Sequence, residues 1–192
     1  KKSKVPEGFA ITSEAYRRLV DHDGLWARLM DILDRTNWAD PKVTAAASDK
    51  LCELILKAPL PDGLETDIRI AYERLERKFG RNVAVAVRSS ATAEDLPTAS
   101  FAGVHESYLN VRGPKALISA VKDCYASLFS ERAISYRIDK GFAHRSVALS
   151  VGVQRMIRAD RASSGVIFTL DTESGSRDVV MVTGVWGLGE AI

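Results

Sequence analysis

The chain has 192 residues and a formal net charge of +2, from 27 basic and 25 acidic side chains. Such an even balance does not argue for a nucleic-acid surface or for an anionic membrane as partner, and no apolar run reaches the ~20 residues that cross a bilayer. Hydrophobic residues make up 46% and charged residues 27%, which is typical of a globular protein with a buried core, so we expect neither nucleic acid nor a membrane as partner.

The first 80 residues are predicted to be mostly helical. Thr12 or Ser13 is a suitable N-cap for a first helix, and Gly80 is a suitable residue to end the last one. Between these points a loop is expected at Pro61-Asp-Gly63. Apolar residues recur at helical spacing over residues 13–20, 25–33, 42–56 and 65–79.

Strands alternate with helix in the remainder. The run Val83–Val87 is short and rich in β-branched residues, which predicts a buried strand. A polar turn over 171–178 lies between two apolar runs and predicts a hairpin. Further strands are expected at 107–111, 147–157, 165–170 and 179–182, with helical spacing over 115–141. Helices first and then strands joined partly by hairpins favour an α+β fold.

Arg88 directly follows the predicted strand 83–87, and Ser89 and Ser90 come next. A guanidinium at the end of a buried strand is unfavourable unless an anion meets it. Two hydroxyls and the backbone N–H groups of a turn would form a cradle for phosphate. The alternative is a structural ion pair between Arg88 and Glu94 or Asp95, and the residues alone leave both interpretations open.

Two further segments carry polar or glycine residues typical of a nucleotide site. Gly187, Gly189 and Glu190 stand between a predicted strand and a predicted helix, a context that favours phosphate binding. Glycines after a strand more often form a simple tight turn, and the spacing is not that of the dinucleotide fingerprint. Gln154 and Met156 share one face of a predicted strand; the alternative is an edge Gln and a core Met.

The remaining chemistry-bearing side chains are predicted to be structural. Cys52 and Cys124 are expected to be small buried residues in a reducing compartment, which indicates the cytoplasm. His22, His105 and His144 are expected to be structural or exposed. No nucleophile with a neighbouring base and no metal site is predicted within these residues.

The segment 87–103, with Val87-Arg-Ser-Ser-Ala-Thr-Ala-Glu-Asp-Leu-Pro and Ser100-Phe-Ala-Gly103, resembles the signature of the nucleotide-binding domain of phosphoenolpyruvate synthases (pyruvate, water dikinases). Other blocks resemble later parts of that domain in the same order, at 5–12, 153–156, 164–169 and 186–191. The resemblance implies an ATP-grasp fold, in which two α+β lobes clasp the nucleotide. The lobes would be 1–112 with 179–192, and 113–178, parts of one incomplete domain.

The resemblance also implies a role for each matching residue. Arg88, the expected catalytic residue, would neutralise charge on the phosphates of ATP. Asp171 either belongs to the block that faces the phosphates or simply starts the turn. The residues expected to bind the nucleotide are Ser89, Ser90, Gln154, Met156, Thr169, Gly187, Gly189 and Glu190.

The activity that the resemblance implies is phosphorylation of a histidine by ATP, giving AMP and phosphate, followed by transfer to pyruvate to form phosphoenolpyruvate, a step of gluconeogenesis. Most Mg²⁺ ligands, the phosphohistidine domain and the pyruvate-binding domain are expected beyond residue 192, and a Gly-Gly-Lys segment before residue 5. The 192 residues are therefore expected to be an inactive part of a longer homodimeric enzyme. The alternatives are a related dikinase, an antibiotic phosphotransferase, or a nucleotide-binding regulatory module without transfer chemistry.

Overall fold

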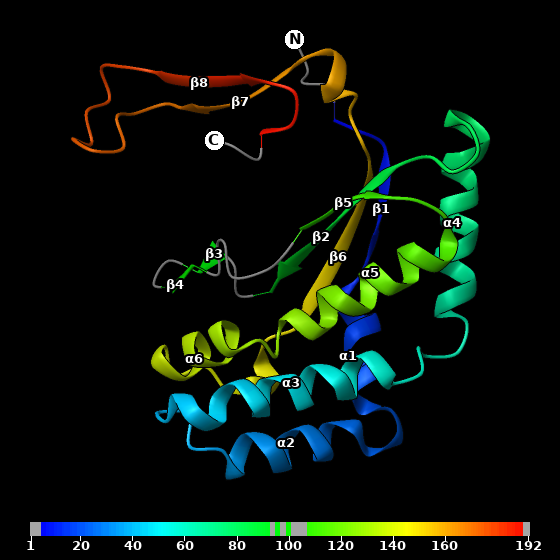
Figure 1. Ribbon diagram of the computed structural model, residues 1–192, viewed down its shortest axis with the longest axis vertical. Coiled ribbons are helices and arrows are strands. Elements are labelled where there is room, and N and C mark those ends of the chain that lie inside the picture. Colours follow the sequence, from blue (N-terminus) through cyan, green and yellow to red (C-terminus); the bar gives the residue numbers. More distant parts are fainter. Residues whose placement is uncertain (1–4, 93–94, 97–98, 101–106, 190–192) are drawn as a thin grey trace. The chain divides into compact units, whose positions relative to one another are not determined.

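The computed structural model describes residues 5–92, 95–96, 99–100 and 107–189 (Figure 1). The chain divides into two compact units, Lys1–Met156 and Ile157–Ile192, which are described separately. This division differs from the lobes expected from the sequence, because residues 113–156 belong to the first unit. Helix and sheet are both present, so the predicted mixed α+β class is confirmed.

The first unit contains the helices that the spacing of apolar residues predicted. Asp40 begins one of them by accepting a hydrogen bond from the Lys42 backbone N–H at 2.9 Å, with Pro41 in the first turn. Gly80 ends another with a φ of 101° that only glycine adopts readily. The α-helices are α1 (Ser13–Asp21), α2 (Leu25–Arg35), α3 (Pro41–Lys57), α4 (Leu64–Phe79), α5 (Pro114–Ser127) and α6 (Glu131–Asp139).

The helical stretch predicted over 115–141 is two helices rather than one. Helix α5 ends at Ser127, and Ser130 caps α6 by accepting a hydrogen bond from the Ala133 backbone N–H at 3.3 Å. The apolar stripe runs across both helices, which is why periodicity alone did not reveal the break.

Four antiparallel strands form the sheet of the first unit, in the order β1-β6-β2-β5. Strand β2 covers Val85–Ala91, so it starts later and runs four residues further than predicted, because β6 pairs with it along its whole length. The other strands are β1 (Gly8–Ile11), β5 (Ser107–Val111) and β6 (Leu149–Arg155). Two short strands, β3 (Asp95–Leu96) and β4 (Ala99–Ser100), pair with each other.

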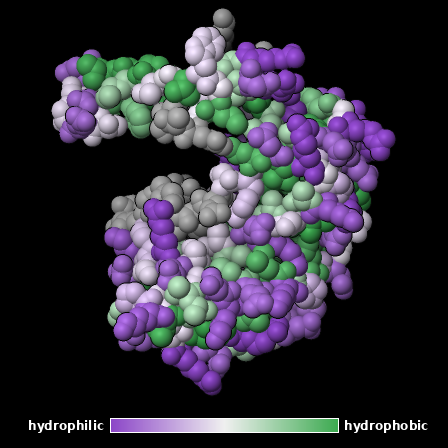
Figure 2. Space-filling view, in the orientation of Figure 1, coloured by the Kyte–Doolittle hydropathy of each residue, from purple (hydrophilic) through white to green (hydrophobic). Residues whose placement is uncertain are grey.

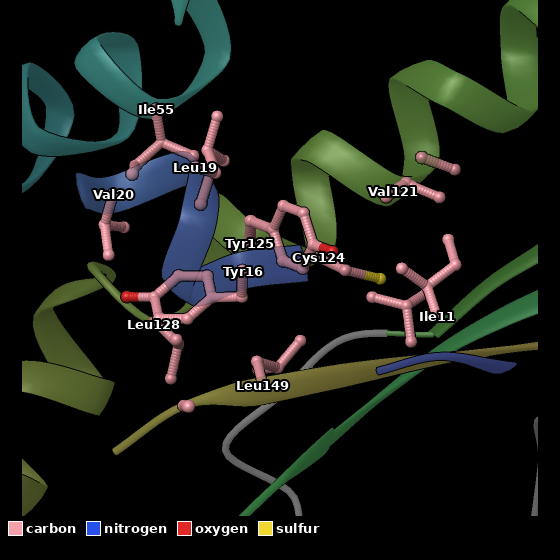
Figure 3. Packing of buried hydrophobic residues seen from close by; sticks show 14 of the residues in the cluster. Ile11, Tyr16, Leu19, Val20, Ile55, Val121, Cys124, Tyr125, Leu128 and Leu149 are labelled. Atoms are coloured by element: carbon pink, nitrogen blue, oxygen red, sulfur yellow. The ribbon is translucent and has the colours of Figure 1, made fainter. Parts of the chain in front are cut away.

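One face of this sheet is covered by helices. Alternate residues of β2 and β6, including Val87 and Val151, are fully buried and belong to the hydrophobic core. Figure 3 shows Leu149 of β6 facing a cluster that includes Tyr16 of α1 and Tyr125 of α5, whose rings lie 5.4 Å apart. Helices α1, α3 and α5 lie on this side of the sheet (Figure 1). Among the described residues of β2, the opposite face carries the exposed Arg88 and Ser90, and this is the face that we consider for a ligand.

Helix α6 contains a buried cation, Arg137. The Arg137 side chain of α6 is only 2% exposed. Its Nη1 donates to the Leu128 carbonyl at 2.6 Å and its Nε to the His144 Nδ1 at 3.0 Å, while its guanidinium lies over the Phe129 ring. Burial lowers the pKa of Arg137 to about 10. Burial, followed by the charge of Arg137, lowers the pKa of His144 to about 4, so His144 is a neutral acceptor at pH 7.

This arrangement predicts a loss of stability in mild acid. The pKa of His144 in the folded protein, about 4, lies below its ordinary value of 6.5, so the unfolded chain binds more protons between these pH values. The free energy of unfolding therefore decreases as the pH falls from 6.5 to 4. Allowing for the partial exposure of His144, we expect a decrease of about 1–2 kcal/mol.

Urea unfolding at pH 7 and pH 4.5, on the wild-type protein and a His144→Gln variant, measures this contribution. We expect the variant to lose less stability than the wild type between the two pH values, because glutamine does not titrate. Equal losses in the two proteins would contradict the assignment.

The second unit is the predicted hairpin. Strand β7 (Ser163–Phe168) pairs antiparallel with β8 (Met181–Trp186), after a short 3-10 turn at Ala159–Arg161. Strand β8 begins at Met181, two residues after the predicted start, and continues to Trp186. Hydrophobic residues gather on this hairpin, whereas hydrophilic residues cover much of the outer surface of α2 and α3 (Figure 2).

Candidate nucleotide-binding site

The uncovered face of the sheet brings three of the predicted site residues together. Arg88 lies opposite Gly152 across β2 and β6, and Ser90 lies opposite Ser150. Because side chains alternate along a strand, these residues point away from the core residues Val87 and Val151. Gln154 lies two residues beyond Gly152, on the same face.

Arg88 lies within strand β2 and not at its end, which corrects the position predicted from the sequence. Its side chain is exposed, and no described residue forms an ion pair or side-chain hydrogen bond with it. Glu94 and the side chain of Asp95 lie outside the described residues, so the alternative of a structural ion pair stays a prediction. Within the described part of the first unit, Arg88 is a cation presented on an open sheet face.

Ser89 and Ser90 do not form the predicted turn, because both continue strand β2. Ser90 is exposed on the face of Arg88, and its carbonyl accepts a hydrogen bond from the Ser150 hydroxyl at 3.2 Å. The Ser89 hydroxyl lies on the other face and is buried without a hydrogen-bond partner among the described residues. The side chain of Ser90, and not that of Ser89, is therefore placed to meet a ligand beside Arg88.

Gln154 and Met156 lie toward the other end of β6. Strand β6 is flanked by β1 and β2, so Gln154 is not on an edge strand and that alternative is wrong. Met156 directly follows β6, and its backbone N–H donates to the Ala84 carbonyl at 2.9 Å. Both side chains are half-buried, so Met156 is not a fully buried core residue either.

Four other predicted residues belong to the second unit, three of them among the described residues. Thr169 follows β7. Gly187 follows β8 with a φ of +86°, and its carbonyl accepts a hydrogen bond from the Ser164 hydroxyl at 2.6 Å. Gly189 is exposed, and Glu190 lies outside the described residues. The glycine loop thus forms a tight turn, as glycines after a strand commonly do.

Asp171 starts the turn of the hairpin. Its carboxylate accepts hydrogen bonds from the Ser174 hydroxyl and from the Glu173 backbone N–H, the latter at 3.0 Å. These bonds, that of Ser174 first, lower the pKa of Asp171. No group of three or more His, Cys, Asp or Glu side chains that could hold a metal ion occurs among the described residues.

Comparison with known proteins identifies the family. The family model "Pyruvate phosphate dikinase, AMP/ATP-binding domain" matches residues 1–192. The chain belongs to this family. The match to this family includes both the sheet strands around Arg88 and the hairpin of the second unit. The resemblance seen in the sequence blocks is therefore confirmed.

The relatives that the chain matches are much longer than the chain. The chain is 50% identical to the phosphoenolpyruvate synthases of Helicobacter pylori and Escherichia coli over 98% of its length. It is 50% identical to that of Pseudomonas aeruginosa over the same share. It spans about a quarter of the length of these relatives, 23–24%. No helix among the described residues has the length and apolar character to span a membrane.

Proposed function

We propose that the chain is the ATP-binding part of a phosphoenolpyruvate synthase. The observation that carries this proposal is Arg88, exposed on the uncovered sheet face with no ion-pair partner among the described residues, in a chain of the AMP/ATP-binding family. An arginine binds phosphate through parallel N–H···O bonds, and an open sheet face gives the phosphate access to it.

The proposed nucleotide lies along strand β6. Met156 and Ser150 are six residues apart, and at about 3.4 Å per residue they span about 20 Å of sheet. The adenine would lie toward Gln154 and Met156, where an amide and a soft thioether suit a polar aromatic ring. The phosphates would lie toward Arg88 and Ser90, which offer a positive charge and a hydroxyl.

Residues of the second unit also belong to this proposal. Thr169, Gly187, Gly189 and Glu190 would contact the nucleotide, as the resemblance to an ATP-grasp domain implies. The support is that Gly187, Gly189 and Glu190 match the family motif position by position and that Thr169 lies in a block that resembles the family, whereas the turn at Gly187 alone is one that glycines after a strand commonly form. Magnesium would accompany ATP, with its ligands mostly outside residues 1–192.

The reaction would proceed in two transfers. A histidine imidazole on another domain attacks the β-phosphoryl group of ATP, AMP leaves, and water releases the γ-phosphate. The phosphohistidine then passes its phosphoryl group to pyruvate, giving phosphoenolpyruvate and free histidine. Arg88 would disperse the negative charge that develops on the phosphates. A homodimer in the cytoplasm, active in gluconeogenesis, belongs to the same proposal.

Product analysis of the full-length protein with ATP and pyruvate tests the reaction. We expect one AMP, one inorganic phosphate and one phosphoenolpyruvate for each ATP consumed. If added phosphate is required and pyrophosphate is formed instead, the protein is a phosphate-dependent dikinase. If ATP binds but no phosphoryl transfer to any acceptor occurs, the protein is a nucleotide-binding module.

A further inference from the structure

Gly152 lies in the middle of β6, directly opposite Arg88, and nothing in its backbone requires a glycine. Its φ lies outside the left-handed region, and a Cβ built there would meet no described atom closer than the Arg88 carbonyl oxygen at 3.8 Å. Gly8 on β1 is different, because a Cβ there would lie 2.0 Å from the Val153 carbonyl oxygen. Packing therefore explains Gly8 but not Gly152.

A glycine inside a strand has an unfavourable effect on stability. It loses more backbone entropy on folding than any other residue and has no side chain to pack. Where it is kept, it often marks a point at which another backbone or a ligand approaches the strand closely. No other described backbone approaches Gly152 on this face, so the described residues give no packing reason for the glycine and leave space beside it for a ligand.

We infer that Gly152 is a positioning residue for the phosphates of the nucleotide. This inference rests on the proposed function, because the ligand is taken to be ATP bound by Arg88. Directly opposed side chains of two strands have Cβ atoms about 5 Å apart, so a side chain at 152 would stand beside the Arg88 side chain. A phosphate oxygen bonded to the guanidinium needs that volume, since the N···O distance is about 2.8 Å.

If Gly152 has this role, a larger side chain at position 152 should weaken ATP binding without lowering the stability of the fold. Replacing Gly152 by Val adds a β-branched residue favoured in strands and restricts the unfolded chain, so the fold should become no less stable. The same side chain would fill the space beside Arg88 and displace the phosphates. If Gly152 had only a structural role, the substitution would weaken ATP binding only by lowering the stability of the fold.

The test uses the full-length protein with Gly152→Ala and Gly152→Val, titrated with ATP and with adenosine. For Gly152→Val we expect ATP affinity to fall at least about tenfold, with a smaller fall for Gly152→Ala. Adenosine affinity should stay within about twofold because the adenine lies toward Gln154, and the unfolding temperature should be equal or higher. Ala10→Val is the matched control, because Ala10 pairs with Gly152 from β1, one strand farther from Arg88. This control should keep ATP affinity within about threefold.

The outcomes separate this inference from the function on which it rests. Unchanged ATP affinity in Gly152→Val, an equal loss for ATP and adenosine, or a lower unfolding temperature would each overturn the role of Gly152. If Arg88→Ala weakens ATP binding in the same series, the proposed function stands without Gly152. If Arg88→Ala also binds ATP like the wild type, the proposed function itself fails.

Discussion

Replacing Arg88 by Ala in the full-length protein should lower kcat/KM for ATP at least about tenfold, or about 1.4 kcal/mol of transition-state stabilisation, while leaving the fold intact. Arg88 is exposed, and no described residue pairs with it, so its removal leaves no buried partner unsatisfied. Arg88→Lys should restore only part of the activity, because an ammonium keeps the charge but cannot form two parallel bonds to a phosphate. Steady-state kinetics with thermal unfolding measures both properties.

An exposed arginine elsewhere in the first unit provides the control for this substitution. Arg74 lies on α4 and is exposed, so Arg74→Ala removes the same charge from the protein away from the sheet face. We expect it to change kcat/KM less than twofold, since surface charges far from a site have weak effects. If Arg88→Ala unfolds the protein while Arg88→Lys keeps full activity, the structural ion pair is the better interpretation.

The second large effect concerns stability. Arg137→Ala should decrease the free energy of unfolding by about 3 kcal/mol, because it leaves a cavity and removes the donor to a buried carbonyl. The Leu128 carbonyl, which accepts from Arg137 Nη1 at 2.6 Å, would lose this bond. The contact of the guanidinium with the Phe129 ring would also be lost. Chemical denaturation of the wild type and the variant measures the difference.

Arg132 provides the matched control on the same helix. Its side chain is exposed, so Arg132→Ala should change the free energy of unfolding by less than about 0.5 kcal/mol. Similar effects of the two substitutions would show that the buried hydrogen bonds of Arg137 contribute little.

The helices were predictable because their signals are local. Gly80 after an apolar stripe marks a helix end wherever it occurs, and the apolar spacing over 42–56 predicted α3 to within one residue at each end. The end of β2 was not predictable in the same way. Arg88 and Ser90 resemble turn residues, but pairing with β6 carries the strand through Ala91, and that partner lies some 60 residues further along the chain.

The site shows the same difference between local and long-range information. Arg88 was predicted from its residue type and its neighbours, and Gln154 from the family resemblance, and both stay predictions as nucleotide contacts. The role inferred for Gly152 could not be predicted, because it depends on the register that sets Gly152 opposite Arg88, and no sequence pattern reports register between strands distant in the chain. The Ser89 hydroxyl was predicted to face the ligand because Ser89 was expected in a turn. Ser89 instead continues strand β2, where the alternation of side chains places its hydroxyl on the buried face.

A crystal structure of the full-length protein with a non-hydrolysable ATP analogue tests the central claim most directly. The sheet-face assignment predicts that guanidinium nitrogens of Arg88 lie about 2.7–2.9 Å from phosphate oxygens, with the adenine at the Gln154 end of β6. A nucleotide bound away from this face, or Arg88 bonded to a carboxylate of the protein while ATP is bound, would contradict it.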